Sequence, residues 1–459
     1  MRLADVGVWL DIHSLDSQKS RRQLARDLEV FLGRRTISDI TEARDSLGRP
    51  PSKKLARSFI EWAEREKKKI LFLEFFESTG TVTLTDRRGH VRWLNFPSTI
   101  NAETSPLRLE EVLARNEYFV PVGNLAQVFD PSSKVWALRA ITSIFPPLPF
   151  TPPQLRSGRT NLSDHLRKLE RDSIEIIRAA VTSARNPAML FSMGKDSMAM
   201  LRLAEKAFSP GTIPFKLIGV DTRWKFQEMY SFRSWLESRD DLEYEVFINP
   251  EAIKQNVGPF SHGSARHTDI TKTQALRMLL DHGKYDVVFG GARRDEEKSR
   301  AKERVFSVRD ELHRWDPKTQ RPELWNCYNT YLSDGHSFRV FPLSDWTERD
   351  IWEYVNAEQI PIVPLYFSAV RPVVKRNGSL IMIDDDRFPL QEGENVFFAP
   401  LRFRTLGCYP LTGGFESEAT SVSDIINELQ DLRQSERSSR VIDSDVGASM
   451  EQKKREGYF

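Results

Sequence analysis

The chain has 459 residues, which is enough for two or three domains, and its formal net charge of +2 demands neither a nucleic-acid nor a membrane partner. Two cysteines exclude a disulfide framework, a Cys₄ zinc site and a cysteine-ligated iron–sulfur cluster, and they fit a reducing cytoplasm. No apolar run reaches the roughly 18 residues of a membrane-spanning helix. Asp5 and Asp11 interrupt the N-terminal apolar residues, so the pattern of a signal peptide is absent.

Residues 1–144 are predicted to form an α+β extension of unknown function. A first helix places four apolar residues on one face: Leu24, Leu28, Phe31 and Leu32. A second helix is expected over residues 55–69. Alternating apolar residues on either side of an Asp-Arg-Arg-Gly turn predict a hairpin: Val82, Leu84, Val91 and Trp93. No catalytic constellation precedes Pro146, so we expect the extension to be dispensable for catalysis.

Two origins remain open for this extension. It is either a real appended domain, whose apolar residues Trp62, Leu71 and Trp93 could bury a small core, or the product of a misplaced start codon. No methionine lies between Met1 and Met189, and Met189 falls inside a predicted strand. A shorter product would therefore need a non-AUG start near the proline-rich segment that follows.

A proline-rich linker is predicted over residues 145–160. Five prolines within "IFPPLPFTPPQLRSGRTN" prevent a continuous helix and favour an extended connector. Beyond it, a helix over residues 161–181 precedes five apolar strands: residues 188–192, 215–221, 244–249, 286–292 and 338–343. Helical patterns fill the gaps and follow the last strand: residues 198–208, 224–238, 268–283 and 347–358. This alternation predicts a doubly wound α/β domain with a mostly parallel sheet, which binds ligands at the carboxyl ends of its strands.

The turn between the first of these strands and its helix has the composition of a phosphate site. It reads Ser192-Met193-Gly194-Lys195-Asp196-Ser197. Gly194 lets the backbone approach a ligand, the helix N-terminus offers free N–H groups, and Lys195 adds a positive charge. The turn is not a Walker A loop, which needs Gly-x-x-x-x-Gly-Lys-Ser/Thr. The alternative is a capped helix that carries a surface lysine.

This turn resembles the PP-loop, the Ser-x-Gly-Lys-Asp-Ser signature of ATP pyrophosphatases, which have an adenine nucleotide alpha hydrolase-like fold. Those enzymes attack the α-phosphate of ATP and release pyrophosphate. Met193 stands where the wider superfamily often has glycine. The motif alone also admits ligases, tRNA thiolases and reductases of adenylyl sulfate compounds.

Further segments are similar to the small, nucleotidyl-transferring subunit of bacterial ATP sulfurylase. They are "PFKLIGVDTRWKFQEMY", "HGSARHTDITKTQAL", "FGGARRDEEKSRAKERVFSVRDELHRWDPKTQRPELWN", "RVFPLSDWTERDIWEYV", "IPIVPLYF", "RFRTLGCYPLTG" and "SMEQKKREGYF". The resemblance runs from about residue 161 to residue 459. It implies a PP-loop nucleotide-binding domain over residues 161–357 and a C-terminal subdomain over residues 358–459, which completes the site and contributes to a partner interface. Residues 1–144 have no counterpart.

The resemblance implies transfer of the adenylyl group of ATP to sulfate, giving adenylyl sulfate and pyrophosphate, the first step of sulfate assimilation. ATP is a substrate that arrives with Mg²⁺, and neither a tightly bound cofactor nor a protein metal site is expected. The synthesis is driven by GTP hydrolysis in a large partner subunit, because this chain has no GTPase signature. No nucleic acid or membrane takes part.

The residues assigned to this chemistry follow strand ends. Cations that offset the charge of ATP and sulfate are the catalytic candidates: Lys195, Arg293, Arg294, Lys298 and Arg300. Of these, Arg293 and Arg294 follow the glycine pair at a strand end, and we expect Arg294 to face the attacking sulfate. The nucleotide-binding candidates are Ser192, Gly194, Lys195, Asp196, Ser197, Asp221, Thr222, Lys272, Gly290 and Gly291. Bland alternatives remain: a solvated helix with an ordinary Glu296–Arg300 pair, and helix caps at Asp221 and near Lys272.

The cysteines weigh against the nearest relatives. Reductases of adenylyl sulfate need a nucleophilic cysteine near the C-terminus, and thiolases usually need paired redox cysteines. Here Cys327 and Cys408 lie far apart, and we expect both to be ordinary buried residues. A catalytically silent interaction protein is the remaining alternative, and the intact Gly-Lys-Asp-Ser turn argues against it.

Overall fold

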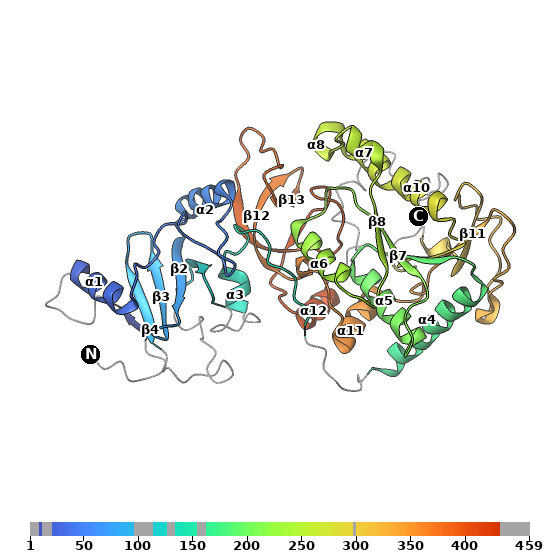
Figure 1. Cartoon of the computed structure of the whole chain (residues 1–459), viewed down its shortest axis with the longest axis horizontal. Coiled ribbons are helices and arrows are strands. Elements are labelled where there is room, and N and C mark those ends of the chain that lie inside the picture. Colours follow the sequence, from blue (N-terminus) through green and yellow to red (C-terminus); the bar gives the residue numbers. More distant parts are fainter. Residues whose placement is uncertain are drawn as a thin grey trace. The chain divides into compact units, whose positions relative to one another are not determined.

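The computed structural model describes residues 9–11, 21–95, 113–125, 134–153, 162–296 and 300–431, which form two compact units (Figure 1). The first unit comprises Met1–Pro147, Ser368–Arg402 and Glu416–Ser421. The second comprises Leu148–Phe367, Phe403–Phe415 and Val422–Phe459. The domain division predicted at residues 144, 160 and 357 stays a prediction, since compactness alone assigns no function to a segment.

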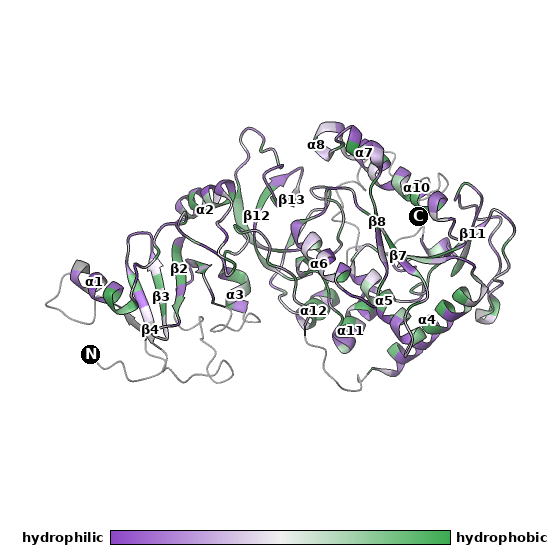
Figure 2. Cartoon of the chain, in the orientation of Figure 1, coloured by the Kyte–Doolittle hydropathy of each residue, from purple (hydrophilic) through white to green (hydrophobic). Residues whose placement is uncertain are grey.

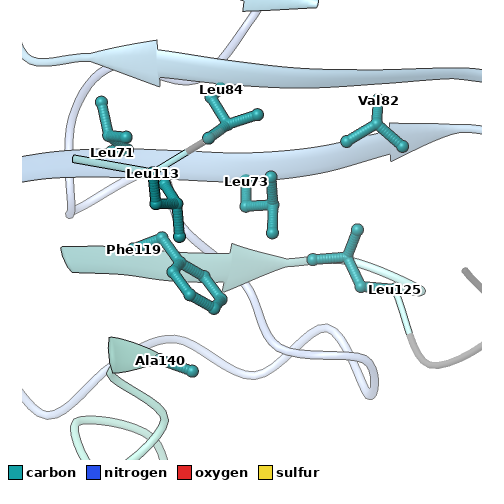
Figure 3. Packing of buried hydrophobic residues seen from close by; sticks show 8 residues of the cluster. All are labelled: Leu71, Leu73, Val82, Leu84, Leu113, Phe119, Leu125 and Ala140. Carbon is teal, nitrogen blue, oxygen red and sulfur yellow. The ribbon is translucent and has the colours of Figure 1, made fainter. Parts of the chain in front are cut away.

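The first unit contains a five-stranded sheet in the order β1-β4-β3-β2-β5. Its strands are β1 (Trp9–Asp11), β2 (Lys69–Phe76), β3 (Thr81–Asp86), β4 (Val91–Asn95) and β5 (Glu117–Val122). The predicted hairpin is confirmed as the antiparallel pair β3–β4, whereas β2 and β5 run parallel. Apolar side chains of β2, β3 and β5 form a common core: Leu71, Leu73, Val82, Leu84 and Phe119 (Figure 3).

Helices α1 (Arg21–Leu32), α2 (Lys53–Arg65) and α3 (Lys134–Arg139) accompany this sheet. The predicted helix over residues 55–69 was too long. It ends at Arg65, because Lys67 has a positive φ of 52° that the right-handed helix does not allow, and β2 begins at Lys69. Leu28 and Leu32 are buried as predicted, but Phe31 is 46% exposed.

Strands β12 (Ala369–Arg376), β13 (Ser379–Met382) and β14 (Phe397–Arg402) belong to the first unit as well. With the short β15 (Phe415–Glu416) they form a sheet in the order β13-β12-β14-β15. Helix α2 packs on β14, where the rings of Phe59 and Trp62 lie 5.1 and 5.4 Å from that of Phe398. A segment distant in sequence therefore covers the apolar side of this sheet.

The second unit contains a six-stranded sheet in the order β10-β11-β9-β6-β7-β8. Its strands are β6 (Pro187–Leu190), β7 (Lys216–Val220), β8 (Tyr244–Phe247), β9 (Val287–Phe289), β10 (Phe306–Arg309) and β11 (Ser337–Val340). The five predicted strands are present and parallel, which confirms the fold class. Strand β10, which pairs antiparallel to β11, was not predicted.

Helices cover both faces of this sheet, as a doubly wound fold requires. The helices of this unit within the described ranges are α4 (Asp164–Ser183), α5 (Lys195–Phe208), α6 (Gln227–Glu237), α7 (Pro250–Lys254), α8 (Pro259–His262), α9 (Ser264–Thr268), α10 (Ala275–Gly283), α11 (Glu348–Glu358) and α12 (Val422–Asp431). Leu276, Leu279 and Leu280 of α10 pack on one face. On the other face Phe289 contacts Phe215, which contacts Phe208 of α5. In Figure 2 helix α4 carries both hydrophilic purple and hydrophobic green.

One helical region departs from the predicted geometry. The segment expected as a helix over residues 268–283 is divided into α9, a π-helical turn η3 (Asp269–Gln274) and α10. Such π turns occur often at functional sites, because they displace side chains from regular helical spacing. Short 3₁₀ turns are η4 (Arg300–Lys302), η5 (Leu324–Asn326) and η6 (Pro364–Tyr366). None of the helices within the described ranges is long and apolar enough to cross a membrane.

Candidate active site

The PP-loop turn connects β6 to α5, as the sequence predicted. Gly194 is the N-cap of α5, and a Cβ atom there would lie only 3.3 Å from the Oγ of Ser192. The hydroxyls of Ser192 and Ser197 are 2.9 Å apart, which draws the two ends of the turn together. Met193 has a φ of 64°, a strained value for a side chain of its size, and it is buried. The turn is thus held in a backbone shape that its own residues do not favour.

Lys195, in the first turn of α5, is almost fully buried with 1% of its surface exposed. Its backbone N–H donates to the hydroxyl of Tyr366 at 2.9 Å. Its ammonium group donates to the carbonyl oxygen of Arg404 at 3.4 Å and lies 3.5 Å from Asp196 and 3.9 Å from Glu348. A buried lysine among carboxylates is a cation held in a site of low dielectric constant, where its charge acts strongly on an anion.

Arg293 joins the PP-loop from the segment after β9. Its Nε donates to the carboxylate of Asp196 at 2.7 Å, and the residue is 1% exposed. Gly291 permits this approach, because a Cβ atom at that position would lie 3.3 Å from the Cβ of Asp196. Gly290 continues the strand by donating its N–H to the carbonyl of Val340 at 2.9 Å. The double glycine therefore brings an arginine to the turn.

Two carboxylates complete the charged network. Glu348, at the start of α11, forms a bidentate ion pair with Arg404, whose Nη2 lies 2.5 Å from Oε2 and whose Nε lies 3.1 Å from Oε1. The carboxylate of Asp295 accepts the N–H of Glu348 at 3.1 Å and lies 3.5 Å from Arg293. Buried cations at the strand ends are therefore partnered by carboxylates, and these pairs hold the cations in place without a ligand.

Asp221 and Thr222 follow β7, where the sequence placed them. The carboxylate of Asp221 accepts from Arg233 at 2.7 Å and from the N–H of Arg223 at 2.7 Å. The hydroxyl of Thr222 lies 3.2 Å from the sulfur of Cys408. Asp221 therefore stabilises its own loop, as the helix-cap interpretation expects. It also lies at the edge of the sheet where nucleosides bind in such folds.

Arg294 and Arg300 form ion pairs with carboxylates other than Asp196, Asp295 and Glu348. Arg294 is ion-paired with Asp345 on the loop after β11. Arg300 pairs with the buried Glu303 at 3.1 Å, which also pairs with Arg309 at 2.7 Å. Lys298 lies outside the described residues. The roles assigned to these cations from the sequence stay predictions.

Lys272 is half-buried in η3 and acts electrostatically on three buried residues, Lys225, His267 and Cys408. Burial lowers the pKa of Lys225, and the neighbouring Lys272 lowers it further. Burial lowers the pKa of His267 to about 4, and Lys272 contributes in the same direction, so the ring is neutral at pH 7. Burial raises the pKa of the Cys408 thiol, but Lys272 and Lys225 outweigh this effect and leave the pKa below its usual value.

Sequence reasoning missed several residues of the site, among them Tyr366, Glu348, Arg404 and Lys225. All four lie in segments that carry the resemblance to ATP sulfurylase, yet no local motif assigns them a role. Among the described residues, no group of three or more His, Cys, Asp and Glu side chains is placed to hold a metal ion.

Comparisons with known proteins agree with this geometry. The model of the phosphoadenosine phosphosulfate reductase domain matches residues 186–414. The chain is 62% identical over 295 residues to sulfate adenylyltransferase subunit 2 2 of Marinobacter nauticus, covering 64% of this chain and 97% of that protein. It is 59% identical over 295 residues to sulfate adenylyltransferase subunit 2 of Hahella chejuensis, covering 64% of this chain and 98% of that protein.

The chain belongs to the sulfate adenylyltransferase subunit 2 family, a family of enzymes. It is also similar to a solved phosphoadenylyl-sulfate (PAPS) reductase of Candida auris, with 16% identity, a TM-score of 0.32, and coverage of 45% of this chain and 93% of that one. That score is too low to support an argument about function.

Proposed function

We propose that this chain transfers the adenylyl group of ATP to sulfate, forming adenylyl sulfate and pyrophosphate. The observation that carries the proposal is the convergence of buried Lys195 and Arg293 on the PP-loop turn, at the carboxyl ends of β6 and β9. High identity to relatives named sulfate adenylyltransferase subunit 2 supports the same reaction. One sulfate oxygen attacks the α-phosphorus, and the bond from that phosphorus to the bridging oxygen of pyrophosphate breaks.

In this reaction the PP-loop turn binds the phosphates that leave as pyrophosphate. The hydroxyls of Ser192 and Ser197 and the backbone at Gly194 surround that position, and Lys195 neutralises charge there. The loop of Asp221 and Thr222 receives the nucleoside, as strand-end loops do in such sheets. Because both reactants are anions, the buried cations stabilise charge that builds up in the transition state.

The carboxylates beside these cations have a consistent role. Asp196 pairs with both Lys195 and Arg293, and Glu348 lies 3.9 Å from Lys195. These pairs keep the cations oriented before ATP arrives. Triphosphate oxygens then compete for the same ammonium and guanidinium groups, so binding exchanges one set of ion pairs for another.

A partner and a metal ion follow from the energetics. The phosphate–sulfate anhydride is a high-energy bond, so we propose a large GTP-binding subunit whose GTP hydrolysis drives the synthesis. The designation subunit 2 in the relatives' names agrees with such an assembly. Mg²⁺ enters with ATP, held mainly by phosphate oxygens. We place the reaction in the cytoplasm, which the low cysteine content favours.

The test is a pyrophosphate-release assay on the chain co-purified with its large subunit. We expect release that requires ATP, sulfate and GTP together. ATP binding without sulfate-dependent release would favour a catalytically silent interaction protein and would refute the proposal.

The matching reductase-domain model calls for a second measurement, because it raises a reductase as the competing function. A reductase needs an accessible sulfur nucleophile, but Cys408 is 2% exposed and its sulfur contacts Thr222. Cys327 is exposed. Incubation with adenylyl sulfate and a dithiol should release no sulfite from the wild-type chain. Thiol-dependent sulfite that disappears in Cys327→Ser would establish the reductase instead.

A further inference from the structure

Beside the PP-loop lies a cluster of polar side chains that contains the buried Lys225 and His267 and the half-buried Lys272. Lys225, in the loop between β7 and α6, is 9% exposed, and its ammonium group forms no hydrogen bond or ion pair with any described residue. His267 is fully buried, and neither ring nitrogen forms a hydrogen bond of good geometry within the described part of the chain, although the backbone of Thr222 lies near enough to favour its protonated form. The buried hydroxyl of Thr268 is likewise unpartnered there. Groups of this kind are costly to bury without a ligand.

The members of this cluster act on one another. Lys272 lowers the pKa of Lys225, whereas Cys408 raises it. Lys272 and Lys225 both lower the pKa of His267. The nearby carboxylate of Asp221 is already engaged by Arg233 at 2.7 Å. Among the described residues, the ammonium group of Lys225 is therefore left without a carboxylate paired directly to it.

The chain segment that carries Lys225 is held by a backbone hydrogen bond and by aromatic packing. The N–H of Tyr409 donates to the carbonyl of Trp224 at 2.8 Å, and their rings stack at 6.1 Å. Phe226 packs against Phe403 at 4.8 Å. On the third side, the π-helical turn η3 presents Lys272. This packing fixes Lys225 between two chain segments.

The chemistry of the cluster defines its ligand. Two ammonium groups donate hydrogen bonds in several directions, a neutral imidazole donates one, and the Thr268 hydroxyl adds another. Such a set of donors matches the oxygens of a small tetrahedral dianion. A carboxylate or a nucleobase would leave donors unsatisfied.

The position of the cluster relates it to the reaction. Arg404, whose carbonyl accepts from Lys195 at 3.4 Å, is four residues before Cys408. Four residues span at most about 14 Å, so the cluster lies within the length of a nucleotide from the PP-loop. The α-phosphate of ATP fits in this interval.

We propose that Lys225, Lys272 and His267 bind the sulfate that attacks ATP, an inference that rests on the proposed function. It gives the attacking oxyanion a site separate from the PP-loop that binds the leaving pyrophosphate. It also competes with the sequence-based assignment of sulfate to Arg294, which is paired with Asp345 in this structure.

The kinetic test uses the chain with its large subunit. Lys225→Met and Lys272→Met should each raise the KM for sulfate by about tenfold or more, as expected when one charge-assisted hydrogen bond is lost, and leave the KM for ATP nearly unchanged. Lys254→Met, at an exposed position on α7, is the matched control and should change neither constant. If the KM for ATP rises instead, the cluster binds a phosphate of ATP and the sulfate site is refuted.

A binding measurement on the isolated chain distinguishes this site from the reaction. Sodium sulfate should raise the melting temperature of the wild-type chain more than sodium chloride of equal ionic strength, and Lys225→Met should abolish the difference. Without sulfate, Lys225→Met should melt no lower than the wild type, because it removes an uncompensated buried charge. A structural lysine would give the opposite result.

The two failures are separable. A wild-type complex that binds ATP but never releases pyrophosphate with sulfate overturns the proposed function. A melting temperature that responds to sulfate equally in the wild type and Lys225→Met, or in neither, overturns the sulfate site whatever the turnover.

Discussion

Deleting residues 1–157 should leave catalysis intact but expose an apolar face of the first unit. The deletion removes α2, whose Phe59 and Trp62 pack on Phe398 of β14 at ring distances of 5.1 and 5.4 Å. It also removes the hydrogen bonds from Lys54 to the carbonyl of Phe388 and from Arg65 to that of Val396, at 2.7 and 3.0 Å. The cations proposed for catalysis all lie beyond residue 157.

The expected loss of stability follows from the apolar surface that the deletion exposes to water. Phe398 is 4% exposed, and returning a buried phenylalanine side chain to water costs about 1.5–3 kcal/mol. In the full-length chain, Trp62→Ala removes one of the two aromatic side chains that pack on Phe398 and leaves the rest of α2 in place. It should cost about 3–5 kcal/mol of unfolding free energy, the usual range for a large aromatic residue in a core.

The assay compares a chain that begins at Gly158 with the full-length chain, each co-expressed with the large subunit. Sulfate-dependent turnover per folded molecule should match that of the full-length chain, whereas solubility and melting temperature should fall. Phe398→Ser should improve the solubility of the truncated chain but destabilise the full-length chain, because the side chain is exposed in one and buried in the other.

The opposite effects of Phe398→Ser on the truncated and the full-length chain are the critical observation. If Phe398→Ser harms both chains equally, α2 is not the cover of β14, and the packing argument fails. If the truncated chain is soluble and folded yet inactive, residues before the linker contribute to the site or to the partner interface. The predicted domain division then fails.

Three further predictions concern the second unit. Lys195→Ala should keep the fold but lower turnover by about 30- to 1,000-fold, which corresponds to about 2–4 kcal/mol of lost transition-state stabilisation, and near-normal turnover would refute the phosphate role. Arg294→Ala, measured by varying sulfate at saturating ATP, should raise the KM for sulfate if the sequence-based assignment is right, and should leave it unchanged if the Lys225 cluster holds sulfate. His267 is neutral when folded with a pKa of about 4 but takes up a proton near its ordinary value of 6.5 when unfolded, so stability should fall as the pH drops from 6.5 towards 4. Urea unfolding without sulfate should show about 2 kcal/mol of this loss by pH 5, and His267→Gln, which cannot take up that proton, should not show it.

The parallel strands were predictable because strands buried on both faces appear as nearly continuous apolar runs. Strand β10 was not, since its sequence includes Arg309 among Phe306, Ser307 and Val308. Arg309 is 2% exposed because its guanidinium pairs with the buried Glu303 at 2.7 Å. No sequence pattern predicts that an arginine of this kind will be buried, because the carboxylate that permits its burial is brought close by the tertiary fold.

The candidate site divides in the same way. The PP-loop residues and Gly291 were predictable, since strand, turn and helix place them locally. Tyr366 and Arg404 were not, because they reach Lys195 from 171 and 209 residues away along the chain. The burial of Lys225 was not predictable either, since a lysine beside Trp224 and Phe226 is equally typical of an exposed loop.

The two groups of buried cations differ in what holds them, and this difference agrees with different tasks. Lys195 and Arg293 are oriented by Asp196, so electrostatic pairing maintains their geometry and a more highly charged ligand can replace the carboxylate. Lys225 has no such partner among the described residues, and its neighbours in sequence, Trp224 and Phe226, pack against Tyr409 and Phe403. A triphosphate carries enough charge to displace a carboxylate, whereas a sulfate dianion is a weaker competitor. An oxyanion of lower charge is therefore better served by cations that no carboxylate already occupies.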